Sequence, residues 1–111
     1  MEYSIVVATY NSAKHINQFV YELLDIFRKK LSEFEIILVN DASSDTTQKI
    51  LEDLSRKNSQ IQILELTKNS GQQIAFSAGI DNANGRVVIL LDDDMLNFEA
   101  AINSVSPCNS W

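Results

Sequence analysis

Three consecutive aspartates, Asp92-Asp93-Asp94, follow an apolar run and are the residues whose type and spacing most suggest chemistry. Adjacent carboxylates repel one another, and a divalent cation removes that cost. All-oxygen ligands suit Mg²⁺ or Mn²⁺, and Mg²⁺ is usually held by one or two carboxylates together with substrate phosphates. Because alternate residues of an extended segment point the same way, Asp92 and Asp94 are predicted to flank one metal site while Asp93 faces elsewhere. A solvated acidic loop explains the triplet alone equally well.

Three further positions have the chemistry to recognise a nucleotide. Asp41 follows the apolar run Ile36–Val39 and precedes a predicted helix, so its carboxylate can accept from a ribose hydroxyl or a base N–H. The alternative is that two or more polar residues of Asp41–Asp45 cap that helix. Tyr10 offers a ring for stacking on a base, and packing against its own loop is an equally open interpretation. Gly71 at a helix start can bring backbone N–H groups close to an anion, a weak signal for a single glycine.

The elements that must position these residues follow from short apolar runs that alternate with longer amphipathic segments, the pattern of βαβ units and a parallel sheet. The third run alternates and suits a sheet edge, whereas the fourth is apolar throughout and is expected to be buried on both faces. A first helix is expected from Asn11 or Ser12, a second with its N-cap at Ser44, a third from Gly71 to Asn84-Gly85, and a weak fourth at Phe98–Val105. The four runs predict strands at Tyr3–Ala8, Ile36–Val39, Ile61–Leu66 and Val87–Leu91.

Polar side chains follow three of the four predicted strands. In an open parallel sheet the carboxyl ends of the strands share one edge, and ligands bind there where the strand order reverses. We therefore expect a ligand site at that edge, built from Thr9-Tyr10-Asn11, Asn40-Asp41-Ala42-Ser43 and Asp92-Asp93-Asp94.

Composition narrows the function classes. The 111 residues carry 9 Lys and Arg against 15 Asp and Glu, a net charge of -6, so no basic stripe is present for duplex nucleic acid. One cysteine, Cys108, fits a reducing compartment, and the longest apolar runs are far shorter than the roughly 20 residues of a membrane span. The N-terminus lacks the features of a signal peptide. These features predict a soluble intracellular domain.

Taken together, in order and at these spacings, four segments resemble the family-two glycosyltransferases of GT-A fold. The resemblance extends to about Phe98, and the stretch from Gly71 to Asn97 is most similar to enzymes that transfer a hexose to polyprenyl phosphate. The family commonly has proline where Ala8 stands and aspartate where Asn40 stands, and the polyprenyl-phosphate branch often has glutamine where Leu96 stands. The four segments are Ser4–Asn11, Val39–Asp45, Asn69–Ala75 and Leu90–Asp94.

The resemblance implies an α/β fold, an open and mostly parallel sheet of Rossmann-like βαβ units that forms a partial GT-A nucleotide-diphospho-sugar transferase fold, with strands ordered 3-2-1-4. Residues 1–98 would be the nucleotide-sugar-binding half, and residues 99–111 a weak helix and tail of a truncated domain. It also implies that Ala8, Thr9 and Tyr10 border the nucleoside and that Asp41 contacts the base or ribose. Asp92 would lie near the ribose or diphosphate, and Asp94 would hold Mg²⁺ or Mn²⁺. Gly71 and Asp93 are included among the nucleotide-binding residues, and Asp92 is a second metal ligand.

The expected activity is metal-assisted transfer of a sugar from a nucleoside-diphosphate sugar to an acceptor, with polyprenyl phosphate at the membrane surface as one candidate, in cell-wall or polysaccharide biosynthesis. The resemblance places the catalytic base in a half that follows, so this chain is expected to bind nucleotide weakly and turn over little. The expected location is the cytoplasm, peripheral to the inner face of the membrane. A non-catalytic α/β nucleotide-binding or oligomerisation module, pairing through its exposed sheet edge, is the alternative. A nucleotidyltransferase ranks last because Thr9–Lys14 contains no glycine.

Overall fold

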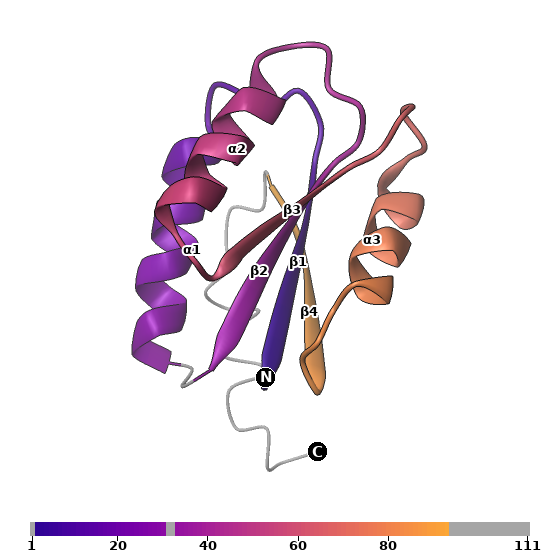
Figure 1. Ribbon diagram of the computed structural model, residues 1–111. Helices are drawn as coiled ribbons and strands as arrows, with labels where there is room; N and C mark the ends of the chain where they lie inside the picture. Colours follow the sequence, from indigo (N-terminus) through magenta and orange to yellow (C-terminus); the bar gives the residue numbers. More distant parts are fainter. Residues whose placement is uncertain (1, 31–32, 94–111) are drawn as a thin grey trace.

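The computed structural model describes residues 2–30 and 33–93, which form a parallel sheet flanked by helices (Figure 1). The strand order β3-β2-β1-β4 confirms the expected topology. The predicted helix at 98–105 and the expected metal ligand Asp94 lie outside the described residues. The elements are β1 (Tyr3–Thr9), α1 (Ile16–Lys30), β2 (Phe34–Asn40), α2 (Thr47–Lys57), β3 (Ile61–Glu65), α3 (Gln72–Asp81) and β4 (Val87–Asp92).

The pairing register brings the carboxyl ends of the strands together at one edge of the sheet. β1 pairs in parallel with β2 on one side and β4 on the other, with Thr9 opposite Asn40 and Ala8 opposite Asp92. β2 pairs with β3, which ends at Glu65 opposite Asn40. The polar residues that follow β1, β2 and β4 therefore emerge side by side, as the sequence predicts.

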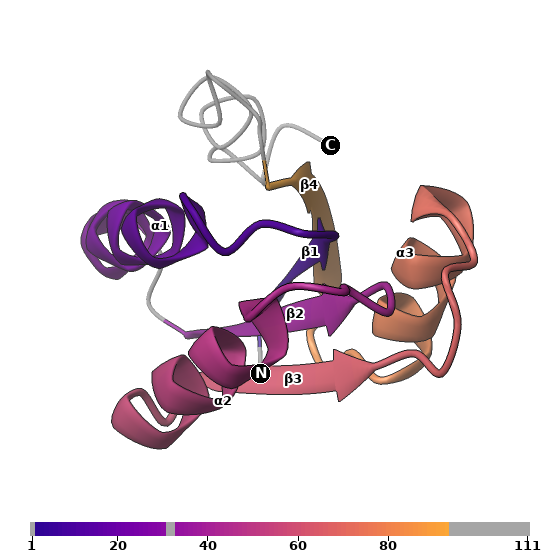
Figure 2. The ribbon, with the colours of Figure 1, turned by 90° about the horizontal axis from the view of Figure 1, so that it is seen from above.

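Helices cover both faces of the sheet. α1 and α2 lie on one face and α3 lies on the other, as the view from above shows (Figure 2). Alternate residues of β1 point to opposite faces, so Ile5 and Val7 join the larger apolar core under α1 and α2, whereas Val6 and Ala8 join the smaller one under α3. This two-sided burial explains why β1 and β2 are apolar along most of their length.

Gly79 lets α3 approach β1 closely. A Cβ atom at this position would lie 2.3 Å from Val6 Cγ1 and 3.3 Å from Val39 Cγ2, well inside contact distance. Because glycine has no side chain, α3 can lie this close to the central strands, and Gly79 sets that spacing. Since α3 also forms one wall of the site described below, this contact helps to fix that wall.

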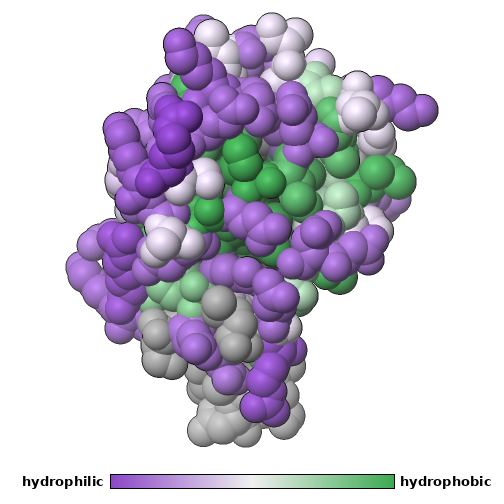
Figure 3. Space-filling model, in the orientation of Figure 1, coloured by the Kyte–Doolittle hydropathy of each residue, from purple (hydrophilic) through white to green (hydrophobic). Residues whose placement is uncertain are grey.

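The two outer strands are more exposed than the central pair. β3 leaves Ile63 and Leu64 partly exposed, which confirms its predicted place at an edge. An apolar area framed by hydrophilic residues is visible on the face of the molecule where β3 lies in front (Figure 3). The expectation that β4 is buried on both faces is wrong: Leu91 is buried, but Leu90 is 42% exposed. The reason is that α3 packs on β1 and β2, so it leaves the Leu90 side of β4 uncovered.

Three helix ends differ from their predicted positions. α1 begins at Ile16 rather than at Asn11 or Ser12, because residues 13–15 form a turn before the helix. α2 begins at Thr47 with Thr46 as its N-cap, so the predicted N-cap at Ser44 is wrong. The reason is that Asp45 supplies the capping carboxylate: its Oδ1 accepts the Thr47 N–H at 2.9 Å. α3 ends at Asp81, short of Asn84-Gly85, because Asn84 leaves the helix to donate its N–H to Glu35.

Glu35 anchors the other end of the sheet, opposite the carboxyl ends of the strands. Its buried carboxylate accepts hydrogen bonds from the Ser4 hydroxyl at 2.5 Å and from the Asn84 N–H at 2.7 Å. Ser4 Oγ in turn accepts the Gly85 N–H at 2.7 Å. Burial raises the pKa of Glu35, but the hydrogen bonds outweigh it and hold that pKa below its usual value. These contacts join β1, β2 and the turn that leads into β4.

None of the three helices in the described part of the chain has the length and apolar character needed to cross a bilayer.

Candidate functional site

An open pocket of about 360 Å³ lies at the carboxyl edge of the sheet. It sits where β1 and β4 are neighbours, which is where the order of the strands reverses and where ligands bind in open α/β sheets. Six of the seven residues expected to bind a nucleotide line it; Gly71 does not. The lining residues are Ala8, Thr9, Tyr10, Asp41, Gln72, Ala75, Asp92 and Asp93.

The end of β1 contributes a backbone segment and one ring. Thr9 is buried, and its hydroxyl donates to the Val39 carbonyl oxygen at 3.0 Å, so the side chain ties β1 to β2. The Tyr10 side chain follows at the rim and is 50% exposed. Asn11, in the left-handed region at φ 49°, holds the loop in place: its Oδ1 accepts the Ser44 N–H at 2.8 Å. The ring of Tyr10 thus has room to stack on a planar ligand.

Asp41 forms the floor of the pocket on the β2 side and is only 5% exposed. Its Oδ1 accepts the Ser70 N–H at 2.7 Å, and its Oδ2 accepts the Gly71 N–H at 2.9 Å. Gly71 lies at φ 93°, a conformation that favours glycine. The anion that the Gly71 N–H contacts is therefore Asp41 itself, which explains why Gly71 is near the pocket without lining it.

The hydrogen bonds of Asp41 and Asp45 also bear on the alternative that two or more polar residues of Asp41–Asp45 cap α2. Asp45 accepts the Thr47 N–H at the start of α2, whereas Asp41 accepts the N–H groups of the segment before α3. Capping of α2 by two or more residues of Asp41–Asp45 is therefore not observed. An ionised carboxylate offers about four lone-pair sites, of which the two N–H groups use two. Asp41 therefore keeps the capacity to accept a further hydrogen bond from a ligand.

Asp92 forms the opposite wall of the pocket. Its partly exposed carboxylate accepts a hydrogen bond from Gln72 Nε2 at 2.6 Å. Sequence reasoning missed Gln72 and Ala75 as pocket residues. The available signal was their place in the first turn of the helix after Gly71, which the sheet topology brings over the end of β1.

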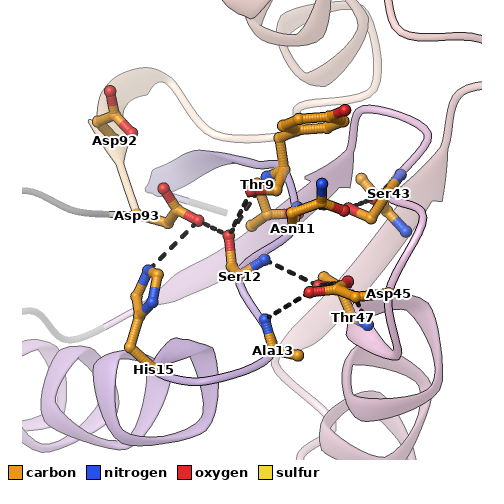
Figure 4. A network of polar contacts seen from close by, with 12 residues as sticks. Thr9, Asn11, Ser12, Ala13, His15, Ser43, Asp45, Thr47, Asp92 and Asp93 are labelled. Carbon is orange, nitrogen blue, oxygen red and sulfur yellow. Dashed lines mark hydrogen bonds and ion pairs between the residues drawn. The ribbon is translucent and has the colours of Figure 1, made fainter.

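Asp93 lies in the turn that follows β4, so the expected alternation of an extended segment does not apply to it. Its side chain points in a different direction from that of Asp92 (Figure 4), although both residues line the pocket. Asp93 is 8% exposed, and its Oδ2 accepts a hydrogen bond from the buried Ser12 hydroxyl. His15 Nε2 lies 3.7 Å from the same oxygen. The sequence gives no sign of this cluster, because Ser12 and Asp93 are 81 positions apart.

Within the described residues, the available carboxylate ligands fit a hard cation such as Mg²⁺ only in part. No group of three or more His, Cys, Asp or Glu side chains in residues 2–30 and 33–93 is placed to hold a metal ion. Asp92 presents a carboxylate to the pocket, which matches the one or two protein carboxylates that Mg²⁺ needs beside substrate phosphates. The second expected ligand, Asp94, lies outside the described residues.

Comparison with known proteins places this geometry in a family. Residues 4–105 match the model of glycosyl transferase family 2. The chain is 42% identical over 95 residues to an uncharacterized glycosyltransferase of Synechocystis sp., covering 86% of this chain and 30% of that protein. It is 34% identical over 95 residues to the bactoprenol glucosyl transferase of Shigella phage SfV, covering 86% of this chain and 31% of that protein.

A solved structure gives the same result. S. aureus TarS 1–349 in complex with UDP-GlcNAc matches with a TM-score of 0.70 and 31% sequence identity, covering 94% of this chain and 32% of that chain. The expected α/β class and partial GT-A fold are thereby confirmed. The chain spans about 30% of the length of the curated relatives it matches. On the extent of the family match and the identity of its relatives, this chain belongs to glycosyl transferase family 2.

Proposed function

We propose that this chain is the donor-binding part of a glycosyltransferase and that its pocket takes a nucleoside-diphosphate sugar. The observation that carries the proposal is the convergence of an exposed aromatic ring, Tyr10, and two acidic walls, Asp41 and Asp92, around one open pocket. A ring and a hydrogen-bond acceptor suit a nucleoside, and the opposite wall suits a diphosphate with its cation. The TarS complex supports this, since that protein has a similar fold and was solved with UDP-GlcNAc bound.

The pocket residues contact different parts of the proposed nucleoside-diphosphate sugar. Ala8 and Thr9 present the backbone of β1 to the nucleoside, and Tyr10 stacks on the base. Asp41 accepts from the base or ribose through the capacity left beside its two backbone N–H partners. Asp92 lies at the ribose or diphosphate end, where Gln72 orients its carboxylate.

A divalent cation completes the proposed donor site. Asp92 and Asp94 would hold Mg²⁺ or Mn²⁺, which when bound neutralises the charge of the diphosphate leaving group. The chain's own residues bind and orient the donor, and an acceptor oxygen attacks the anomeric carbon as the bond to the diphosphate breaks. A hydroxyl acceptor would need a base to take its proton, and none of the pocket residues is proposed for that role.

We also propose polyprenyl phosphate as the acceptor, at the cytoplasmic surface of a membrane, in the synthesis of a cell-wall or other polysaccharide. The bactoprenol glucosyl transferase of phage SfV supports this choice, because its name specifies a polyprenyl carrier. The acceptor site would lie outside the region of the relatives that this chain spans.

Calorimetric titration of UDP and GDP, with and without Mn²⁺, tests the proposal. We expect one nucleotide to bind with a Kd below about 1 mM and to bind more tightly with Mn²⁺. Tyr10→Ala removes a half-exposed ring and should weaken binding by about 5- to 150-fold, since stacking on a base contributes about 1–3 kcal/mol. Tyr21→Ala is the matched control, because Tyr21 is similarly exposed but lies outside the pocket.

Two results would contradict the proposal. A chain that responds to neither nucleotide and forms dimers by light scattering would be a non-catalytic module. If Tyr10→Ala and Tyr21→Ala weakened nucleotide binding equally, the ring of Tyr10 would not be part of the nucleotide site.

A further inference from the structure

We propose that Asp93 is a positioning residue of the donor site: its hydrogen bond with Ser12 locks the end of β4 onto the loop after β1 and thereby sets where Asp92 stands. The inference rests on the proposed function and identifies a residue pair that serves the same pocket. Neither the family match nor the named relatives assign a role to this pair.

Both members of the pair are buried. Ser12 is 0% exposed and Asp93 is 8% exposed. A carboxylate this deep needs a hydrogen-bond partner, because removing a charge from water without one is costly. The Ser12 hydroxyl donates to Asp93 Oδ2, and a hydrogen bond to a charged acceptor is stronger than one between neutral groups. His15 Nε2, 3.7 Å away, adds a second polar neighbour.

The same oxygen of Ser12 reaches the other side of the pocket. Ser12 Oγ accepts the Tyr10 N–H at 3.3 Å, so one atom contacts both Asp93 and the backbone of the stacking residue. Asp92, the neighbour of Asp93, and Tyr10 both line the pocket. The lock therefore connects two walls of the site that come from β4 and β1.

Ser12 is itself held from the far side, so it can serve as a fixed point. Its N–H donates to the buried Thr47 Oγ1 at 2.8 Å, and Thr47 Oγ1 donates to Asp45 Oδ1 at 2.5 Å. The Ala13 N–H donates to Asp45 Oδ2 at 3.3 Å. The hydrogen bond from Thr47 lowers the pKa of Asp45, which favours the charged form of this acceptor. Figure 4 shows this network running from the start of α2 to the end of β4.

The backbone links the two aspartates, so a fixed Asp93 restrains its neighbour. Asp92 is the last residue of β4 and Asp93 follows it directly, and their side chains point in different directions (Figure 4). Asp93 bonded to Ser12 therefore restrains the backbone of Asp92, whose carboxylate meets Gln72 in the pocket. A ligand site loses affinity when a supporting contact of this kind is removed, because the side chains that touch the ligand are then poorly positioned.

The test compares UDP with uridine in calorimetric titrations of the full 111-residue chain with Mn²⁺. Ser12→Ala and the nearly isosteric Ser12→Cys remove the strong donor. We expect each to weaken UDP binding by about tenfold, the scale for loss of a supporting contact, and to leave uridine binding within about twofold. Asp93→Asn keeps an acceptor for Ser12 and should retain most of the UDP affinity. Ser55→Ala is the control, because the Ser55 hydroxyl donates to the Ile61 carbonyl oxygen away from the pocket.

Selective loss of UDP affinity in both Ser12 variants, together with near-normal UDP affinity in Asp93→Asn, supports the inference. An unchanged ratio of UDP to uridine affinity overturns it, and so does an equal loss of both ligands, which would mean a purely structural role. Failure of the unmodified chain to bind either UDP or GDP is a different result: it overturns the proposed function, and the inference with it.

Discussion

Replacing Asp41 by alanine should destabilise this chain far more than removal of an ordinary surface carboxylate. Asp41 is nearly buried and receives two backbone N–H groups, from Ser70 at 2.7 Å and from Gly71 at 2.9 Å. In Asp41→Ala both donors lose their partner at once, and the segment that leads into α3 keeps only its contacts with the backbone at the end of β2, such as that of Asn69 Nδ2 with the Asp41 carbonyl oxygen.

The size of the effect follows from these two bonds. A hydrogen bond to a charged group contributes about 1.5–3 kcal/mol, so the pair contributes about 3–6 kcal/mol before relaxation. The Ser70 and Gly71 N–H groups are only partly buried, so water recovers a share of this. We expect the free energy of unfolding to fall by about 2–4 kcal/mol, a large part of the roughly 5–15 kcal/mol typical of a whole domain.

Urea unfolding followed by circular dichroism measures this change as a midpoint lowered by about 1–3 M at an unchanged slope. The matched control is Asp25→Asn, because the Asp25 side chain is 67% exposed and its partner Lys29 lies 3.3 Å away on the same helix. Such a pair contributes at most about 0.5 kcal/mol. A loss in Asp41→Ala no greater than in the control would refute the assignment of Asp41 as the anchor of this segment.

Three further outcomes follow from the same structure. Gly79→Ala should lower the free energy of unfolding by about 1–2 kcal/mol in urea, because overpacking against Val6 outweighs the gain in helix propensity. Gly71→Ala should cost about 1–2 kcal/mol in the same assay from backbone strain at φ 93° alone, since the space around it is open. Glu35→Gln should flatten the acid side of the stability profile: the pKa of Glu35 is lowered by folding, so its contribution is present above about pH 4.3 and is lost as the pH falls through the lowered value. An acid profile identical to that of the unmodified chain would contradict the last of these.

The strands could be predicted because the signal lies in continuous apolar runs, whereas their order was implied by the resemblance to the glycosyltransferase family. β1 and β2 are buried along their whole length, and a strand covered on both faces needs apolar residues at nearly every position. The same logic failed for β4, whose run looks alike although Leu90 is exposed. Composition of a strand does not reveal how far the neighbouring helix extends over it.

The candidate site could be predicted as a set of strand ends but not as a set of contacts. The sequence places Tyr10, Asp41 and Asp92 at one edge because parallel strands end together. It does not show that Asp41 binds the backbone of Ser70 and Gly71, or that Gln72 reaches Asp92. Those pairings join residues 20 to 30 positions apart, and they depend on the path of the loop before α3 rather than on any local periodicity.

The opposite ends of the strands carry the Glu35 network, and this separation has a consequence for engineering. Because Glu35, Ser4 and Asn84 fasten the sheet at one end and the pocket occupies the other, the residues at the rim of the pocket can be changed while the fastening is left intact. A library that randomises pocket positions should therefore retain a large fraction of folded members, provided that Thr9, Asp41 and Asp93 are excluded from it.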